Sequence, residues 1–242
     1  MRFVIAAVPL VLTACSFGGN ADADTPGIPG QGSGSTRTYA AADFDSIDLR
    51  GSDNVDVRVG SGFSVRAEGD SDLLDRLRIT REGSSLRIDR RRADGLSWGS
   101  GSAKVLVTMP RIAGARIAGS GDIAVDRVEG ARFDGKIAGS GGLAIGAMQV
   151  DEARLSIAGS GDIEAEGSTQ RLEVSIAGSG SLDAADLKAT SAKVSVSGSG
   201  NVRAALDGEG EVRIAGSGNV DLGRSARCTV RALGSGTARC GG

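Results

Sequence analysis

The heptapeptide IAGSGDI at residues 117–123 decides the fold, because close copies of it return along the rest of the chain. The copies are IAGSGGL (137–143), IAGSGDI (157–163), IAGSGSL (176–182), VSGSGNV (196–202) and IAGSGNV (214–220), and a weaker copy surrounds Gly234. Their first glycines are separated by 20, 20, 19, 20, 18 and 18 residues. Such intervals are typical of repeat proteins, in which each unit stacks on the next because it cannot bury its apolar face alone.

The residues between the copies predict the shape of each repeat. Apolar and polar residues alternate after each Gly-Ser-Gly, and no window has a sustained apolar period of about 3.6 residues. Three short strands with tight corners fit a unit of this length, whereas two helices do not. The sequence therefore predicts an all-β fold, a single-stranded right-handed parallel β-helix (β-solenoid). The residues expected inside are Ile117, Ile123, Val125, Val128, Phe133, Ile137, Leu143, Ile145, Met148, Leu155, Ile163, Ala165, Leu172, Val174, Leu182, Ala184, Leu187 and Val194.

The Gly-Ser-Gly corners are expected to lie directly over one another. Glycine adopts positive φ without a Cβ clash, and its bare backbone lets one corner rest on the next. The serine hydroxyls would then form a column of hydrogen bonds. At the position after the corner no two acids occupy adjacent units, so the stack avoids like charges. The predicted column contains Gly119, Ser120, Gly121, Gly139, Ser140, Gly141, Gly159, Ser160, Gly161, Gly178, Ser179, Gly180, Gly198, Ser199, Gly200, Gly216, Ser217 and Gly218.

The first 14 residues predict a secretory signal peptide, with Arg2 before a short apolar run that is too short to span a bilayer. The ending Leu12-Thr13-Ala14-Cys15 resembles the lipobox of bacterial lipoproteins, which implies an acylated Cys15 as the first mature residue. Ser16 follows where Asp is the usual inner-membrane retention signal, so the resemblance favours the outer membrane. The alternative is an ordinary signal peptide with a cysteine at that position by chance.

The rest of the chain divides into a linker and one folded domain. Residues 15–38 have few apolar side chains beyond the acylated cysteine, and predict a flexible linker. Residues 39–242 are expected to form the β-helix domain. Before the repeats, alternating segments such as 44–49, 55–59 and 104–109 predict strands, and residues 70–77 predict one helical turn. This region is interpreted as irregular first coils that shield the open end of the stack.

Composition excludes several classes of function. The net charge of −2 gives no bulk attraction to nucleic acid, so no nucleic-acid partner is expected. The chain has no histidine, which removes the commonest general base and zinc ligand. The carboxylates of Asp43, Asp45 and Asp48 and of Asp70, Asp72 and Asp75 are interpreted as solvated groups rather than as a cation site. No enzyme activity, cofactor or metal site is therefore predicted.

Two features stand out as candidate partner contacts. The run Arg90-Arg91-Arg92 is either a solvated face or a contact with lipid headgroups or acidic polysaccharide. Trp98 lies in a glycine-rich loop, where it either covers apolar side chains at the N-terminal end or contacts a partner.

Cys228 and Cys240 remain once Cys15 is acylated. The repeat register places both at inward positions, Cys228 with Leu172 and Cys240 with Val125. Because an exported protein meets oxidising conditions, a disulfide that closes the last coil is predicted. The alternative is two small buried residues without a bond.

The chain resembles the head-GIN domain family. The residues that carry this resemblance are Phe44-Asp45-Ser46-Ile47, Val55-Asp56-Val57, Leu86-Arg87-Ile88, Val105–Pro110 and the repeated Gly-Ser-Gly-(Asp/Asn)-(Ile/Val), and together they span about residues 43–223. The resemblance implies a single-stranded β-helix. It also implies a relation to proteins described as auto-transporter adhesin heads, several of which are predicted lipoproteins.

These observations predict a lipid-anchored, non-catalytic cell-envelope protein that presents a β-helical surface, as an adhesin-like module with a protein or polysaccharide partner. One alternative is a structural or signalling partner within the envelope. Another is a polysaccharide-acting β-helix enzyme that uses Glu164, Glu166, Arg171 and Glu173. Both the periplasmic and the surface-facing side of the outer membrane stay open.

Overall fold

The computed structural model describes residues 26–91 and 101–241. Within these ranges the chain is nearly all β, with a single short helix, α1 (Ser71–Arg76). The predicted signal peptide, Cys15, Arg92 and Trp98 lie outside the described residues.

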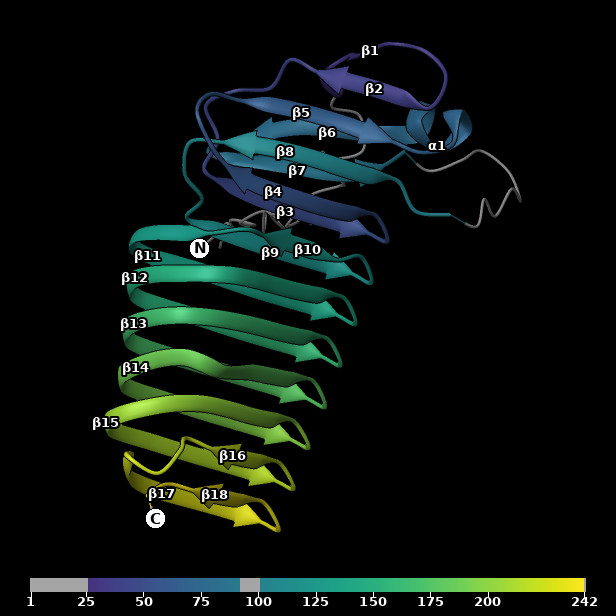
Figure 1. Cartoon of the computed structure of the whole chain (residues 1–242). Helices are drawn as coiled ribbons and strands as arrows, with labels where there is room; N and C mark the ends of the chain where they lie inside the picture. Colours follow the sequence, from purple (N-terminus) through teal and green to yellow (C-terminus); the bar gives the residue numbers. More distant parts are fainter. Residues whose placement is uncertain (1–25, 92–100, 242) are drawn as a thin grey trace, which may run out of the picture.

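The C-terminal part is a stack of coils that all run in the same direction (Figure 1). Each coil pairs in parallel with the next, and equivalent residues of the repeat face one another, as Ile137 faces Ile117 on one side and Ile157 on the other. This pairing confirms the predicted parallel β-helix. Its strands are β9 (Gly114–Gly119), β10 (Ile123–Val125), β11 (Val128–Gly139), β12 (Gly142–Gly159), β13 (Asp162–Gly178), β14 (Ser181–Gly198), β15 (Asn201–Gly216), β16 (Asn219–Asp221), β17 (Arg227–Gly234) and β18 (Thr237–Arg239).

The interior of the stack is the aliphatic core that the repeats predict. Every residue expected inside is buried, and these side chains join one continuous cluster with the core of the N-terminal region. Phe133 is an aromatic residue in this otherwise mostly aliphatic interior, and it is fully buried. Each large apolar side chain of the interior contributes about 1.5–3 kcal/mol through its removal from water. Burial of these side chains is therefore the main source of stability for the stack.

The Gly-Ser-Gly corners form the predicted column. Gly139 lies over Gly119 and under Gly159, and its φ of 139° is a conformation that favours glycine. A Cβ at Gly139 would overlap the carbonyl oxygen of Gly119. The expected serine hydroxyl ladder is wrong: the serines of this fully described column are exposed, and no hydrogen bond joins one hydroxyl to the next. Instead, backbone groups link the corners, as Ser140 N donates to Gly119 O at 2.9 Å.

The N-terminal region interleaves its strands in an order that differs from the chain order. β3 pairs in parallel with β7 on one side and β9 on the other, and β4 likewise lies between β8 and β10. Beyond them, antiparallel strands extend the two sheet faces of the β-helix at its N-terminal end (Figure 1). On one face β5, β2 and β1 follow β8, and on the other β6 follows β7. The strands are β1 (Gly30–Gln31), β2 (Thr36–Tyr39), β3 (Ser46–Gly51), β4 (Asn54–Val59), β5 (Ser64–Glu68), β6 (Leu77–Glu82), β7 (Ser85–Arg90) and β8 (Lys104–Met109).

The flexible linker predicted for residues 15–38 extends too far toward the C-terminus. Strands β1 and β2 belong to the folded domain, since β2 pairs with β5 and Ile28 N donates to Ile79 O at 2.7 Å. Arg37 adds a hydrogen bond to Asp75 at 2.7 Å. Few side chains of this segment are apolar, and its order comes from backbone pairing to a sheet edge that the sequence pattern does not show.

Candidate functional site

The outer surface of the stack carries two columns of alternating charge. Both lie on the segments that end at the Gly-Ser-Gly corner, which we call the long face. In-register pairing aligns the first column as Arg132, Glu152, Arg171, Ser191, Glu209 and Arg227. It aligns the second column as Asp134, Arg154, Glu173, Lys193, Glu211 and Thr229. Opposite charges on adjacent coils stabilise the pairing of their strands, whereas like charges would oppose it.

In the early coils, most charges of the two columns pair with one another. Arg132 contacts Glu152 at 2.7 Å, and Arg154 contacts Glu152 at 2.9 Å and Glu173 at 3.3 Å. The hydrogen bond from Arg132 is the largest influence that lowers the pKa of Glu152 below its usual value. Arg132, Glu152, Arg154 and Glu173 therefore form one network of ion pairs.

The pairing ends where the columns reach the later coils. Arg171, Lys193, Glu209 and Arg227 form no ion pair among the residues that the structure describes. Glu211 is paired sideways with Arg213 rather than along its own column. Within the two columns, the cations Arg171, Lys193 and Arg227 are thus available to a ligand.

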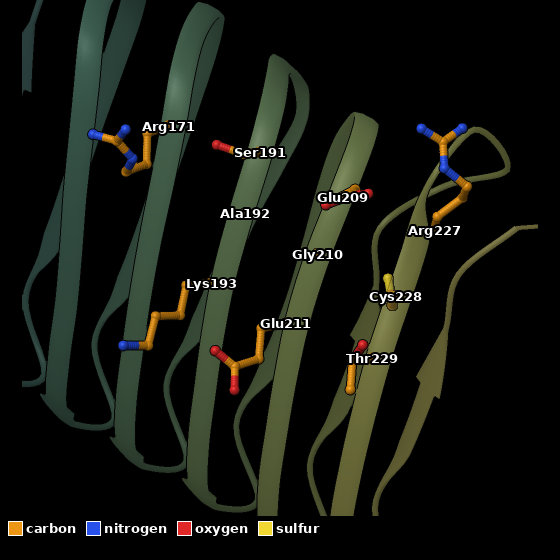
Figure 2. Close-up of a pocket in the computed structure, with 10 residues that line it drawn as sticks. All are labelled: Arg171, Ser191, Ala192, Lys193, Glu209, Gly210, Glu211, Arg227, Cys228 and Thr229. Carbon is orange, nitrogen blue, oxygen red and sulfur yellow. The ribbon is translucent and has the colours of Figure 1, made fainter.

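These unpaired groups border a shallow groove of about 730 Å³. Figure 2 shows its two rows of side chains, one with Arg171, Ser191, Glu209 and Arg227 and the other with Lys193, Glu211 and Thr229. Ala192, Gly210 and Cys228 lie between the rows and form a floor with little side-chain volume. The groove crosses successive coils, so it follows the axis of the β-helix.

The structure does not bring together the residues of the enzyme alternative. Glu164 and Glu166 lie on the segment before the bend at Gly167, whereas Arg171 and Glu173 lie on the long face after it. Glu173 also contacts Arg154 at 3.3 Å. The four side chains therefore do not converge on a common point, as a pair of catalytic carboxylates would have to do.

Arg90 is not the surface cation that the arginine run suggests. Its guanidinium donates to both carboxylate oxygens of Asp53, and to Gly101 O at 2.9 Å. Arg91 is exposed, and its backbone N donates to Arg76 O. Arg92 and Trp98 lie outside the described residues, so the partner contact proposed for them stays a prediction.

Sequence reasoning missed Asp53, which is fully buried. The signal for it is present in the chain, because Gly51-Ser52-Asp53 lies in the corner column with Asp53 in place of the second glycine. Asp53 also accepts a hydrogen bond from Ala103 N at 2.7 Å.

Both aspartate clusters of the N-terminal region include carboxylates that contact arginines, as Asp75 contacts Arg37 at 2.7 Å. Asp45 contacts Arg111 at 3.1 Å, and Asp48 contacts Arg50 at 3.1 Å. No group of three or more acidic, histidine or cysteine side chains in the described ranges is arranged to hold a metal ion.

The last coil contains the disulfide Cys228–Cys240, with 5.9 Å between the two Cα atoms. Cys228 faces Gly210, in the same file as Ala192 and Leu172, which is the register expected from the repeats. The bond joins β17 to the residue after β18 and so closes the last coil across its interior.

Among residues 26–91 and 101–241, no helix has the length and apolar composition needed to cross a bilayer.

Comparisons with known proteins agree with this fold. The family model described as "Putative auto-transporter adhesin, head GIN domain" matches residues 43–226. The structure is similar to a crystal structure of a "putative adhesin" from Bacteroides fragilis, with a TM-score of 0.76 and 18% identity over 85% of this chain and 95% of that chain. It is also similar to a "putative lipid binding protein" from Parabacteroides distasonis, with a TM-score of 0.67 and 22% identity over 87% of this chain and 98% of that one. No curated protein matches the sequence.

Proposed function

Since the chain belongs to the head GIN domain family, we propose that it is a lipid-anchored, adhesin-like module of the cell envelope whose long face binds an extended anionic polymer. The observation that carries this proposal is the change along the two charge columns, from paired charges in the early coils to unpaired charges in the later ones. Arg132 and Arg154 are neutralised by neighbouring carboxylates, whereas Arg171, Lys193 and Arg227 are not.

The chemistry of the groove favours an acidic polysaccharide as this polymer. Arg and Lys bind carboxylate and sulfate groups through charge-assisted hydrogen bonds. Neutral sugars usually bind through aromatic stacking, and no aromatic side chain lines this groove. Because the groove follows the helix axis, successive charged groups of a linear polymer meet successive coils, which are about 4.8 Å apart.

A binding assay tests the groove directly. Full-length protein in mild detergent is titrated with alginate or heparin, and with dextran as the neutral control. Lys193→Glu is expected to weaken binding of the acidic polymers, because it replaces one of the three unpaired cations with a repelling charge. Lys136→Glu is the matched control, since Lys136 is also exposed on the long face but lies outside the groove. Equal effects of the two variants would refute the assignment of the groove.

The lipid anchor and the adhesin role require separate tests. Metabolic labelling with palmitate should mark the wild-type protein and not Cys15→Ser, because Cys15 carries the predicted acyl groups. Protease treatment of intact cells should then remove the domain if it faces the exterior. Protection from protease in intact cells would refute adhesion and favour the alternative role inside the envelope.

A further inference from the structure

The two ends of the β-helix are closed in different ways. Antiparallel strands β1, β2, β5 and β6 finish the N-terminal end. At the other end, β17 pairs only with β15 within the described residues, and β18 pairs only with β16. The outer edge of β17 thus presents a row of unpaired backbone groups, which is a template for pairing with another strand.

Apolar side chains are exposed along this edge. Val230 is 44% exposed and Leu233 is 78% exposed, and they are the large hydrophobic residues that the described surface leaves open. Val212 precedes Val230 in the same file and is fully buried, because another coil covers it. Val230 would be covered in the same way by one more strand.

The last coil is also strongly basic. After Asp221 the sequence has no acidic residue but contains Arg224, Arg227, Arg231 and Arg239. The first three form no ion pair in the described structure, and Arg239 reaches Asp221 only at 3.9 Å. Arg231 moreover lies in register with Arg213, and the two like charges repel each other. A negative charge on the other side of Arg231, where no coil lies, would therefore stabilise this position.

We propose that the β17 edge binds an extended acidic strand of a partner protein, which adds to the stack as its next coil segment. A second copy of this chain fits poorly, because the pairing of two such edges would bring both sets of arginines together. A polyanion without strand structure would match the charge but would leave Val230 exposed. This inference goes beyond the proposed function. The two sites share Arg227, but Lys193 belongs to the groove alone and Arg231 to the β17 edge alone.

The alternation of β17 defines the chemistry of the partner strand. Arg227, Thr229 and Arg231 point outward, whereas Cys228 and Val230 belong to inward files. The complementary strand carries acids opposite Arg227 and Arg231 and apolar residues opposite the inward positions. The order acid, apolar, polar, apolar, acid reads the same in both directions, so it suits parallel and antiparallel addition.

The disulfide prepares this edge for a partner. Cys228 lies within β17, and its bond to Cys240 holds the last coil closed although no further coil packs on it. Less ordering is therefore required when a strand binds.

A designed peptide tests the proposal. The capped peptide Thr-Val-Glu-Val-Thr-Val-Glu-Val-Thr, carrying a fluorophore, is titrated with full-length protein, and binding is followed by anisotropy. Binding should slow amide hydrogen exchange in residues 227–234. Arg231→Glu should weaken binding about tenfold, because one attraction becomes a repulsion. Arg231 is exposed and faces Arg213 on the adjacent coil, so the melting temperature of Arg231→Glu should be no lower than that of the wild type, which would show that the variant folds.

Three controls separate this edge from simple charge attraction and from the groove. A peptide with Lys in place of both Glu should not bind. A peptide with Pro in place of the central Thr keeps its charge but cannot extend a sheet, and equal binding of this peptide would overturn strand addition. Lys193→Glu should leave peptide binding largely unchanged, and a loss as large as that of Arg231→Glu would place the peptide in the groove. Absence of binding by the designed peptide would also overturn the proposal, and would leave the polysaccharide assay unaffected.

Discussion

The guanidinium of Arg90 donates to both carboxylate oxygens of Asp53, whose side chain is fully buried at the corner between β3 and β4. Asp53 stands in the corner column where the later coils have their second glycine. The pair joins the end of β7 to the first corner of that column. The ion pair thus anchors the first corner of the column, and the next corner packs on its backbone, as Gly121 does on Asp53.

Asp53→Ala is expected to destabilise the protein by about 3–5 kcal/mol, because it leaves Arg90 largely buried without its partner. Chemical denaturation measures the loss. Asp56→Ala is the matched control, since Asp56 pairs with Lys104 at an exposed position and should cost at most about 1 kcal/mol. Similar losses in the two variants would mean that the Asp53–Arg90 pair has no special role.

Gly139→Ala should destabilise the stack more than Gly130→Ala does. Both glycines have a φ of 139°, so both substitutions place alanine in a strained conformation that costs about 1–3 kcal/mol. A Cβ at Gly130 meets nothing within 4 Å, whereas one at Gly139 overlaps the carbonyl oxygen of Gly119. The difference between the two unfolding free energies therefore measures corner stacking alone, and a difference of zero would contradict the close approach of the corners.

Glu152 should titrate below its usual pKa of 4.5, because Arg132 and Arg154 stabilise the carboxylate. A group whose pKa is lowered by folding contributes stability above its unfolded pKa, and this contribution is lost as the pH falls through the folded pKa. Carbon-detected NMR follows the carboxyl directly. Arg132→Ala should raise the pKa of Glu152 toward 4.5, whereas Arg116→Ala, on the same face but without contact to Glu152, should leave it unchanged.

Replacement of Cys228 and Cys240 by serine should loosen the last coil. The bond closes a loop with a sequence separation of 12 residues, and loss of such a link costs about 2–3 kcal/mol. Hydrogen exchange should accelerate in residues 219–241 and stay unchanged in β11. Faster exchange throughout the stack would instead indicate that the disulfide supports the whole domain.

The sequence by itself determined the β-helix, its aliphatic interior and its glycine corners. These features recur every 18 to 20 residues, so each copy of the repeat contains the same alternation of apolar and polar residues and the same Gly-Ser-Gly bend. Ile117, Ile137 and Ile157 are predictable as one buried file because equivalent positions of a stack must face one another. The register also places Cys228 inside the last coil for the same reason.

Only the tertiary structure decided how the ends and the surface are finished. The insertion of β3 between β7 and β9, and the pairing of β2 with β5, join segments that no shared period relates. The Asp53–Arg90 pair depends on that arrangement, since the two residues meet only when β7 lies beside β3. The unpaired charges of the groove likewise depend on which side chains reach one another across coils. Periodicity specifies which residues share a file, whereas the contacts of individual side chains between distant segments follow only from the folded chain.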